Sequence, residues 1–129
     1  MVPIEVVERM LEELAGEFPQ EFYNELNGGI LLLPDAKLSE KPGLDNVYIL
    51  GEYHHNHSMG RYIVIYYGSF QMVYGMLSEE ELRHQLFHTL RHEFTHHVES
   101  LAGEKGLEIK DKKRIEAYYA QRAKRNWKK

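Results

Sequence analysis

The stretch SEEELRHQLFHTLRHEFTHHVESLA, residues 78–102, decides the fold because it predicts one long amphipathic helix. Ser78 followed by Glu81 fits a capping box, in which the serine accepts a hydrogen bond from the first turn and the glutamate reaches back. Apolar residues then recur every three or four positions, and no glycine or proline interrupts before Gly103. They are Leu82, Leu86, Phe87, Leu90, Phe94, Val98 and Leu101. Such a helix is about 35 Å long against an expected radius of gyration of about 14 Å, so it must cross the middle of the domain.

One helix and three strands are expected before this central helix. Residues 3–18 form an amphipathic helix by the same spacing rule, with a proline in the first turn. Residues 30–33 (ILLL) lie between glycines and a proline, which favours a buried strand. Residues 47–53 (VYILGEY) and 62–67 (YIVIYY) are β-branched and aromatic, which favours two more strands. We therefore expect an α+β fold.

Length and composition restrict the possible classes of protein. At 129 residues the chain is expected to be a single domain, residues 1–129, with one hydrophobic core. The net charge of -4 gives no global attraction to nucleic acid. No cysteine is present, so any zinc must be held by nitrogen and oxygen ligands.

Targeting signals are not expected. Four glutamates, at positions 5, 8, 12 and 13, stand where a signal peptide needs an apolar run. No stretch approaches the roughly 20 apolar residues that a membrane span requires. These features predict a cytoplasmic protein that does not enter a membrane.

A metal-binding pattern lies midway along the central helix. His92-Glu93-Phe94-Thr95-His96 reads H-E-x-x-H, which on a helix is typical of zinc peptidases. At about 100° per residue, His92 and His96 fall on successive turns outside the apolar arc, where both imidazoles can bind one ion. Glu93 falls at the boundary with the apolar arc, beside the metal. Zn²⁺ held by histidines and a carboxylate activates a water, and Glu93 is placed to act as the general base in amide hydrolysis.

The competing interpretation is a solvated helix face on which the H-E-x-x-H pattern occurs by chance. The other histidines have such ordinary explanations. His84 and His88 continue the four-residue spacing of His92 and His96. They are expected to be solvated, because a straight helix cannot wrap all four histidines around one metal. His97 lies within the apolar arc and is expected to be a hydrogen-bonded core residue. The histidines at 54, 55 and 57 fall in the loop 54–61 between two strands and are expected to be polar loop residues.

Three motifs together resemble a family of small bacterial proteins described as possible zinc metallopeptidases with a minimal zincin fold. They are Leu50-Gly51-Glu52-Tyr53, Ile63-Val64-Ile65-Tyr66 and the segment from His92 to His97, in this order within residues 17–111. The resemblance implies a compact domain in which a metal-binding helix packs on a small sheet. It also implies a peptide or protein substrate that adds to the edge strand, with Zn²⁺ as cofactor.

The third metal ligand departs from the pattern H-E-x-x-H-x-x-G-x-x-D of that family. Glu99 occupies the glycine position and Ala102 the aspartate position. Glu99 lies on the ligand face one turn beyond His96 and is our preferred third ligand. Asp111, after a glycine-rich turn, is the second choice, and Glu116 on a following helix is the third. Carboxylates that do not bind the metal can instead orient the histidines.

Two other classes of function compete with a peptidase. The missing aspartate favours a noncatalytic metal-binding or protein-interaction module with a degenerate site. Residues 110–129 are rich in lysine and arginine, which is also compatible with nucleic-acid binding. A solvated helical tail is the better interpretation of this segment, because the rest of the chain is acidic, so no nucleic-acid partner is expected. The leading prediction is a zinc metallopeptidase of the H-E-x-x-H type.

Overall fold

The computed structural model describes residues 1–105 and 117–120. The elements in order are α1 (Ile4–Glu17), the 3-10 helix η1 (Gln20–Tyr23), β1 (Gly29–Leu33), β2 (Lys37–Leu38), β3 (Tyr48–Ile49), β4 (Gly51–Asn56), β5 (Gly60–Tyr66), α2 (Tyr67–Tyr74) and α3 (Glu79–Lys105). Residues 117–120 are also helical. The chain forms two compact units, Met1–Phe94 and Thr95–Lys129. The prediction of a single domain stays a prediction.

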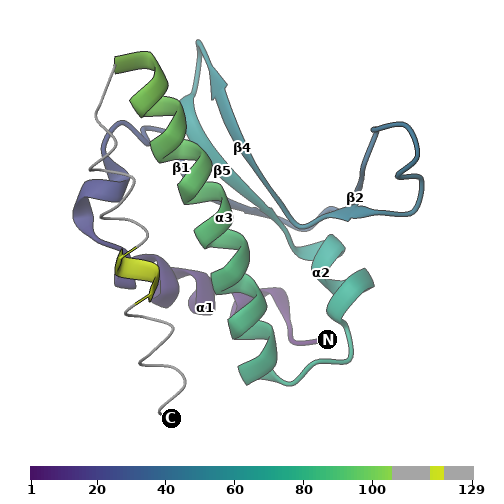
Figure 1. Ribbon diagram of the computed structural model, residues 1–129. Coiled ribbons are helices and arrows are strands. Elements are labelled where there is room, and N and C mark those ends of the chain that lie inside the picture. Colours follow the sequence, from purple (N-terminus) through teal and green to yellow (C-terminus); the bar gives the residue numbers. More distant parts are fainter. Residues whose placement is uncertain (106–116, 121–129) are drawn as a thin grey trace. The chain divides into compact units, whose positions relative to one another are not determined.

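The first unit contains a small mixed sheet, so the α+β prediction is confirmed (Figure 1). Its strand order is β1-β5-β4, in which β1 runs parallel to β5 and β4 runs antiparallel to it. The strands β2 and β3 form a separate antiparallel pair. Within the described residues, β1 and β4 are therefore the two edges of the main sheet.

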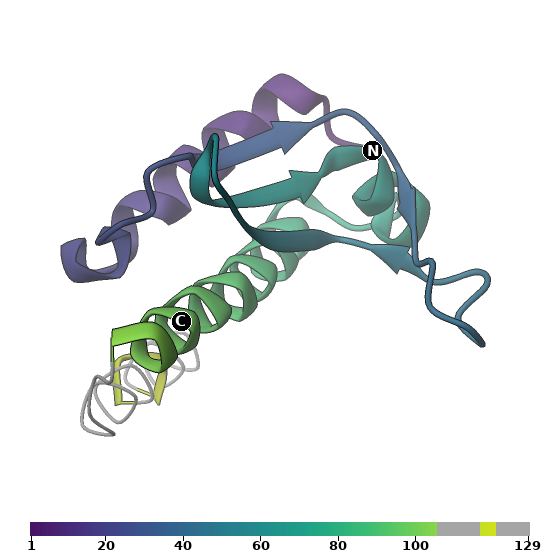
Figure 2. The same cartoon turned by 90° about the horizontal axis from the view of Figure 1, so that it is seen from above.

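Helices cover one face of the three-stranded sheet (Figures 1 and 2). The helix α1 and the part of α3 up to Phe94 lie on this face, and seen from above the strands pass in front of α1 and of the beginning of α3. Side chains alternate between the faces of a strand, so Ile63 and Ile65 of β5 share the helix-covered face with Gly51 of β4. The opposite face carries Glu52 of β4 and Val64 of β5, together with the residues two positions away from each of them along its strand. We call it the open face.

The hydrophobic core of the first unit lies between α1, α3 and the sheet. The helix α1 buries Val7, Met10, Leu11 and Leu14, one stripe of an amphipathic helix. The helix α3 contributes Leu82, Leu86, Leu90 and Phe94, all with no exposed surface. Phe18, which follows α1, packs its ring at 4.6 Å from that of Phe94 and 5.2 Å from that of Phe87. Removing such an aromatic side chain typically costs about 3–5 kcal/mol, so these rings hold α3 in place.

The start of α3 confirms the capping box. The backbone N–H of Glu81 donates to the Ser78 hydroxyl oxygen at 3.2 Å, and the Ser78 N–H donates to the Glu81 carboxylate at 3.2 Å. These two bonds satisfy donors that the first helical turn leaves unpaired. The helix continues to Lys105, two residues beyond the glycine that was expected to end it.

The strands differ from the prediction in three ways. The run 30–33 is an edge strand with partly exposed residues, not a buried one. The predicted strand 47–53 is two strands, because the chain passes at Leu50 from the β2–β3 pair into the main sheet. The loop 54–61 is shorter than expected, so His54 and His55 lie on β4.

The elements η1, β2 and α2 were not predicted from the sequence. The helix α2 (YGSFQMVY) has the aromatic composition of a strand. Its position depends on Gly68, whose N–H donates to the carbonyl of Asp35 at 3.1 Å. A Cβ at Gly68 would lie 2.5 Å from the backbone nitrogen of Ala36, so only glycine allows this close approach. In the described part of the chain, no helix combines the length and apolar character needed to cross a membrane.

Candidate metal centre on helix α3

The motif His92-Glu93-Phe94-Thr95-His96 lies well inside helix α3, as predicted. His92 and His96 are exposed and stand four residues apart on the helix. Residues with this spacing lie on successive turns of the same face. Imidazole nitrogen is a ligand that zinc prefers, and this register places two exposed imidazoles on one face of the helix.

Glu93 differs from both histidines because it is buried, with 5% of its surface exposed. Burial raises its pKa to about 7, and the nearby negative charge of Glu52 contributes in the same direction. A carboxyl with a pKa close to neutral exchanges protons readily at physiological pH. The environment of Glu93 is therefore suited to a general base, and sequence analysis placed this residue correctly at the border of the core.

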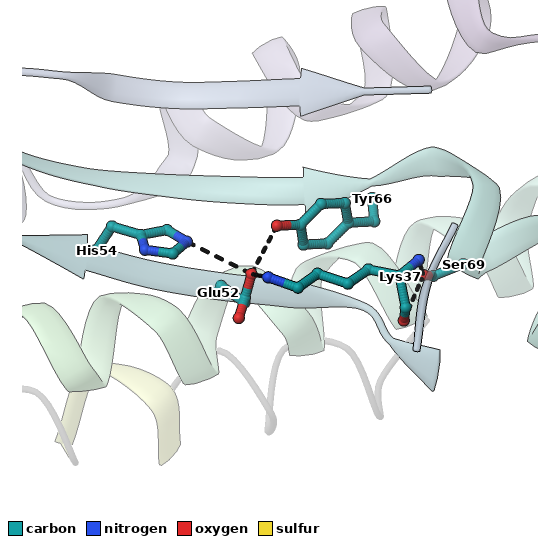
Figure 3. A network of polar contacts seen from close by, with 5 residues as sticks. All are labelled: Lys37, Glu52, His54, Tyr66 and Ser69. Atoms are coloured by element: carbon teal, nitrogen blue, oxygen red, sulfur yellow. Dashed lines mark hydrogen bonds and ion pairs between the residues drawn. The ribbon is translucent and has the colours of Figure 1, made fainter. Parts of the chain in front are cut away.

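Glu52 is the centre of a polar network on the open face of the sheet (Figure 3). The Lys37 ammonium and the Tyr66 hydroxyl each donate to Glu52 Oε1 at 2.6 Å. The Nε2 atom of His54 lies 3.4 Å from the same oxygen, and the His54 ring stacks on that of Tyr62. The side chains of Lys37, Tyr66 and His54 thus converge on the carboxylate of Glu52. The ring of Tyr62 supports His54 by stacking on it.

The network keeps Glu52 negatively charged. Burial by itself raises the pKa of Glu52, but the hydrogen bonds from Lys37 and Tyr66 outweigh it and leave that pKa below its ordinary value. The hydrogen bond to Glu52 also raises the pKa of Lys37, so the pair stays ionised. Burial, followed by the same carboxylate, raises the pKa of Tyr66.

Sequence analysis included Glu52 only as part of the motif Leu50-Gly51-Glu52-Tyr53 and missed this network. The alternation within β4 places Glu52 and His54 on one face, which was a usable signal. No local pattern pointed to Lys37, because it comes from the separate strand β2.

The role of a third metal ligand stays a prediction. Among the described residues, no three histidine, cysteine, aspartate or glutamate side chains are grouped closely enough to hold a metal. Glu99 lies on α3 and is exposed, and its role as a ligand stays a prediction. Asp111, Glu116 and most of the basic segment 110–129 lie outside the described residues.

The remaining histidines agree with their ordinary explanations, apart from those on β4. His84 and His88 are exposed on α3. His97 has no exposed surface, as expected for a core residue. His54 and His55 are strand residues rather than loop residues, which is why His54 can reach the Glu52 network.

The helix α3 approaches β4 closely at Gly51. A Cβ built at Gly51 would lie 2.8 Å from Thr89 Cγ2 and 3.1 Å from Ile65 Cδ1. Thr89 cannot turn away easily, because it is β-branched and buried, and its hydroxyl donates to the carbonyl of Gln85 at 2.9 Å. The glycine therefore sets the separation between the edge strand and the helix that carries Glu93.

Replacing Gly51 with Ala is expected to lower the free energy of unfolding by about 1–3 kcal/mol, because the added methyl group overpacks this contact. Gly16 of α1 is the matched control, since a Cβ there would meet no atom within 4 Å. Gly16→Ala is expected to stabilise the protein by about 0.5–1 kcal/mol. Urea denaturation of both variants checks this prediction, and equal effects of the two substitutions would contradict the close contact.

Comparison with known proteins shows the family to which the chain belongs. No family model matches the chain, and no curated protein matches it. A solved structure described as a conserved hypothetical protein from Thermo thermophilus is 35% identical, with a TM-score of 0.70. The match covers 79% of this chain and 99% of that chain. The chain belongs to the same family as this conserved hypothetical protein. The relative's description includes no activity, so the similarity establishes the family and the fold but no function.

Proposed function

We propose that this protein is a zinc-dependent peptidase with a zincin-like fold. The observation that carries the proposal is the environment of Glu93, a buried carboxyl with a pKa of about 7 between two exposed histidines on one helix. On an ordinary solvated helix face the glutamate of an H-E-x-x-H motif would be exposed, because burying a carboxyl is costly. A general base benefits from this burial.

Each residue of the motif has a separate proposed role. His92 and His96 would hold the zinc ion, and Glu99 is the proposed third ligand. Zinc, when bound, supplies a Lewis acid that activates water and polarises the carbonyl of the scissile bond. Glu93 would accept the proton of the attacking water at its carboxylate.

The edge strand β4 is the proposed site for the substrate backbone. Within the described residues, β4 is hydrogen-bonded only to β5 and its outer edge has no strand partner. Its first residue, Gly51, approaches Thr89 of α3, one helical turn before Glu93. An extended peptide added to β4 would therefore run close to the helix that carries the motif.

A noncatalytic metal-binding or protein-interaction module is the second candidate. It is favoured by the absence, among residues 1–105 and 117–120, of any grouping of three possible metal ligands. Such a module can retain the histidines and bind an ion weakly without turning over a substrate.

Zinc binding by the full chain tests the proposal. We expect native protein to bind Zn²⁺ in isothermal titration, and His92→Ala to lower the affinity at least about 100-fold, because it removes one of the few ligands. His84→Ala is the matched control, since His84 is exposed on the same helix two turns earlier. It is expected to change the affinity less than about threefold. Equal losses from the two substitutions would contradict a site at the motif.

Hydrolysis separates the two candidates. Zinc-loaded protein should cleave members of a broad peptide library, with products identified by mass spectrometry, and a chelator should stop cleavage. Zinc binding at His92 without any cleavage would favour the noncatalytic module.

A further inference from the structure

The edge of the sheet opposite to β4 differs from it in chemistry. The strand β1 (GILLL) contains no charged or polar side chain, whereas β4 (GEYHHN) contains a glutamate, two histidines and an asparagine. Proteins normally protect a sheet edge with charges, proline or a covering element, because an unprotected edge pairs with other strands. All five residues of β1 are partly exposed, and no described strand pairs with its outer edge.

A groove runs along the outer edge of β1, between this strand and the helix α1. Its volume is about 540 Å³. Leu11 of α1 and the strand residues Ile30, Leu31 and Leu32 supply apolar lining. Tyr23 of η1 also lines the groove, and its hydroxyl donates to the carbonyl of Ala15 near the end of α1. The groove therefore has a strand edge on one side and a helix on the other.

Three glutamates of α1 also line the groove. Glu5, Glu8 and Glu12 recur every three or four residues, so they lie along one face of the helix. All three are exposed, and none takes part in an ion pair within the described residues. The helical side of the groove is therefore negatively charged, and the strand side is apolar.

We propose that this groove binds an extended basic segment of a partner protein, which adds as a fourth strand to the outer edge of β1. A strand added there places alternate side chains on the two faces of the sheet. Side chains on the helix-covered face would meet the glutamates of α1, so lysine or arginine fits these positions. Their aliphatic stems would cover Leu11, Ile30 and Leu32.

The other side chains of the bound segment would lie on the open face. Leu31 and Leu33 are in phase with Val64 and Tyr66 of β5, so they also lie on that face. Apolar residues of the partner fit beside them. The recognised pattern is therefore an alternation of basic and apolar residues over about five positions, the length of β1.

A second copy of this chain fits the groove less well. Antiparallel pairing of two β1 strands would bring two sets of glutamates together, and like charges across an interface disfavour association. The chain as a whole is also acidic, with a net charge of -4. The groove lies at the edge of the sheet opposite to β4, so this inference does not depend on zinc or on catalysis.

Peptide binding to the full chain tests the inference. The probe is a short fluorescent peptide in which valine and lysine alternate, measured by fluorescence anisotropy. One control peptide has the same composition with the lysines grouped at one end, and a second has glutamate in place of lysine. We expect the alternating peptide to bind at least about tenfold more tightly than either control, because only it matches both faces of the groove.

Charge-reversal variants locate the site. The double variant Glu8→Lys with Glu12→Lys is expected to weaken binding at least about tenfold, because it reverses the charge along the groove. The matched control is Glu40→Lys with Asp45→Lys, which changes the net charge equally at exposed residues between β2 and β3. This control is expected to change the affinity less than about twofold.

Nuclear magnetic resonance completes the test. The alternating peptide is expected to shift the backbone amide signals of Ile30, Leu31 and Leu32 in the native chain. In the double variant Glu8→Lys with Glu12→Lys, the same peptide is expected to leave these signals unchanged. The inference is overturned if the grouped peptide binds equally, if the two charge-reversal variants behave alike, or if these signals do not move. Concentration-dependent self-association in sedimentation that shifts the same signals without peptide would also overturn it, in favour of a second copy.

Discussion

Glu93→Gln is expected to lower peptide hydrolysis at least about 100-fold while zinc remains bound. Glutamine has the size of glutamate but cannot accept the proton of the attacking water, and general-base catalysis typically contributes about 10²–10⁴-fold. The exposed histidines His92 and His96 are unchanged in this variant, so the proposed zinc affinity should stay close to that of the native chain. The measurement is kcat on a cleaved library peptide, alongside zinc content by elemental analysis.

Two further substitutions on α3 make this result interpretable. Glu80→Gln is the matched control, because it makes the same change at an exposed glutamate of the same helix and should leave kcat unchanged. Glu99→Gln should lower zinc content if Glu99 is the third ligand and leave it unchanged if it is not. Full hydrolysis by the Glu93 variant would remove Glu93 from the mechanism and with it the reason for proposing a peptidase.

The fold around α3 can be predicted from sequence because its signals are local. The capping box of Ser78 and Glu81, the apolar spacing from Leu82 to Phe94 and the absence of breakers all agree with one another. The same spacing placed Glu93 next to the core and His92 outside it. The register of a single helix was enough for these parts of the candidate site.

The parts that were not predicted depend on tertiary contacts. The Glu52 network joins residues from β2, β4 and β5, and the partner Lys37 lies 15 positions away from Glu52 in the sequence. The edge position of β1 follows from its pairing with β5, not from its composition, which is that of a buried strand. The third metal ligand is hard to predict for the same reason, because Asp111 and Glu116 require the chain to return to the helix.

The same Glu93→Gln variant is expected to be more stable than the native chain at neutral pH when metal is removed. The folded protein raises the pKa of Glu93 from 4.5 to about 7, chiefly by burial. Below pH 4.5 the carboxyl is protonated in both the folded and the unfolded chain, so its burial carries no charge penalty. As the pH rises towards 7, the unfolded chain releases the proton first, and the free energy of unfolding falls. Well above pH 7, where the folded carboxyl has also lost its proton, the penalty is complete, at about 3 kcal/mol.

Glutamine is neutral at every pH, so the variant avoids this penalty. Its free energy of unfolding is expected to exceed that of the native chain by up to about 3 kcal/mol at about pH 8, and to match it within about 1 kcal/mol at about pH 4. Urea denaturation with a chelator at both pH values measures the difference, with Glu80→Gln as the control for the substitution itself. A difference that is the same at both pH values would mean that the Glu93 carboxylate is not destabilised by burial. A difference in free energy of unfolding that grows with pH would mean that the buried Glu93 carboxylate destabilises the native fold. Such a destabilising residue is expected where it is retained for chemistry.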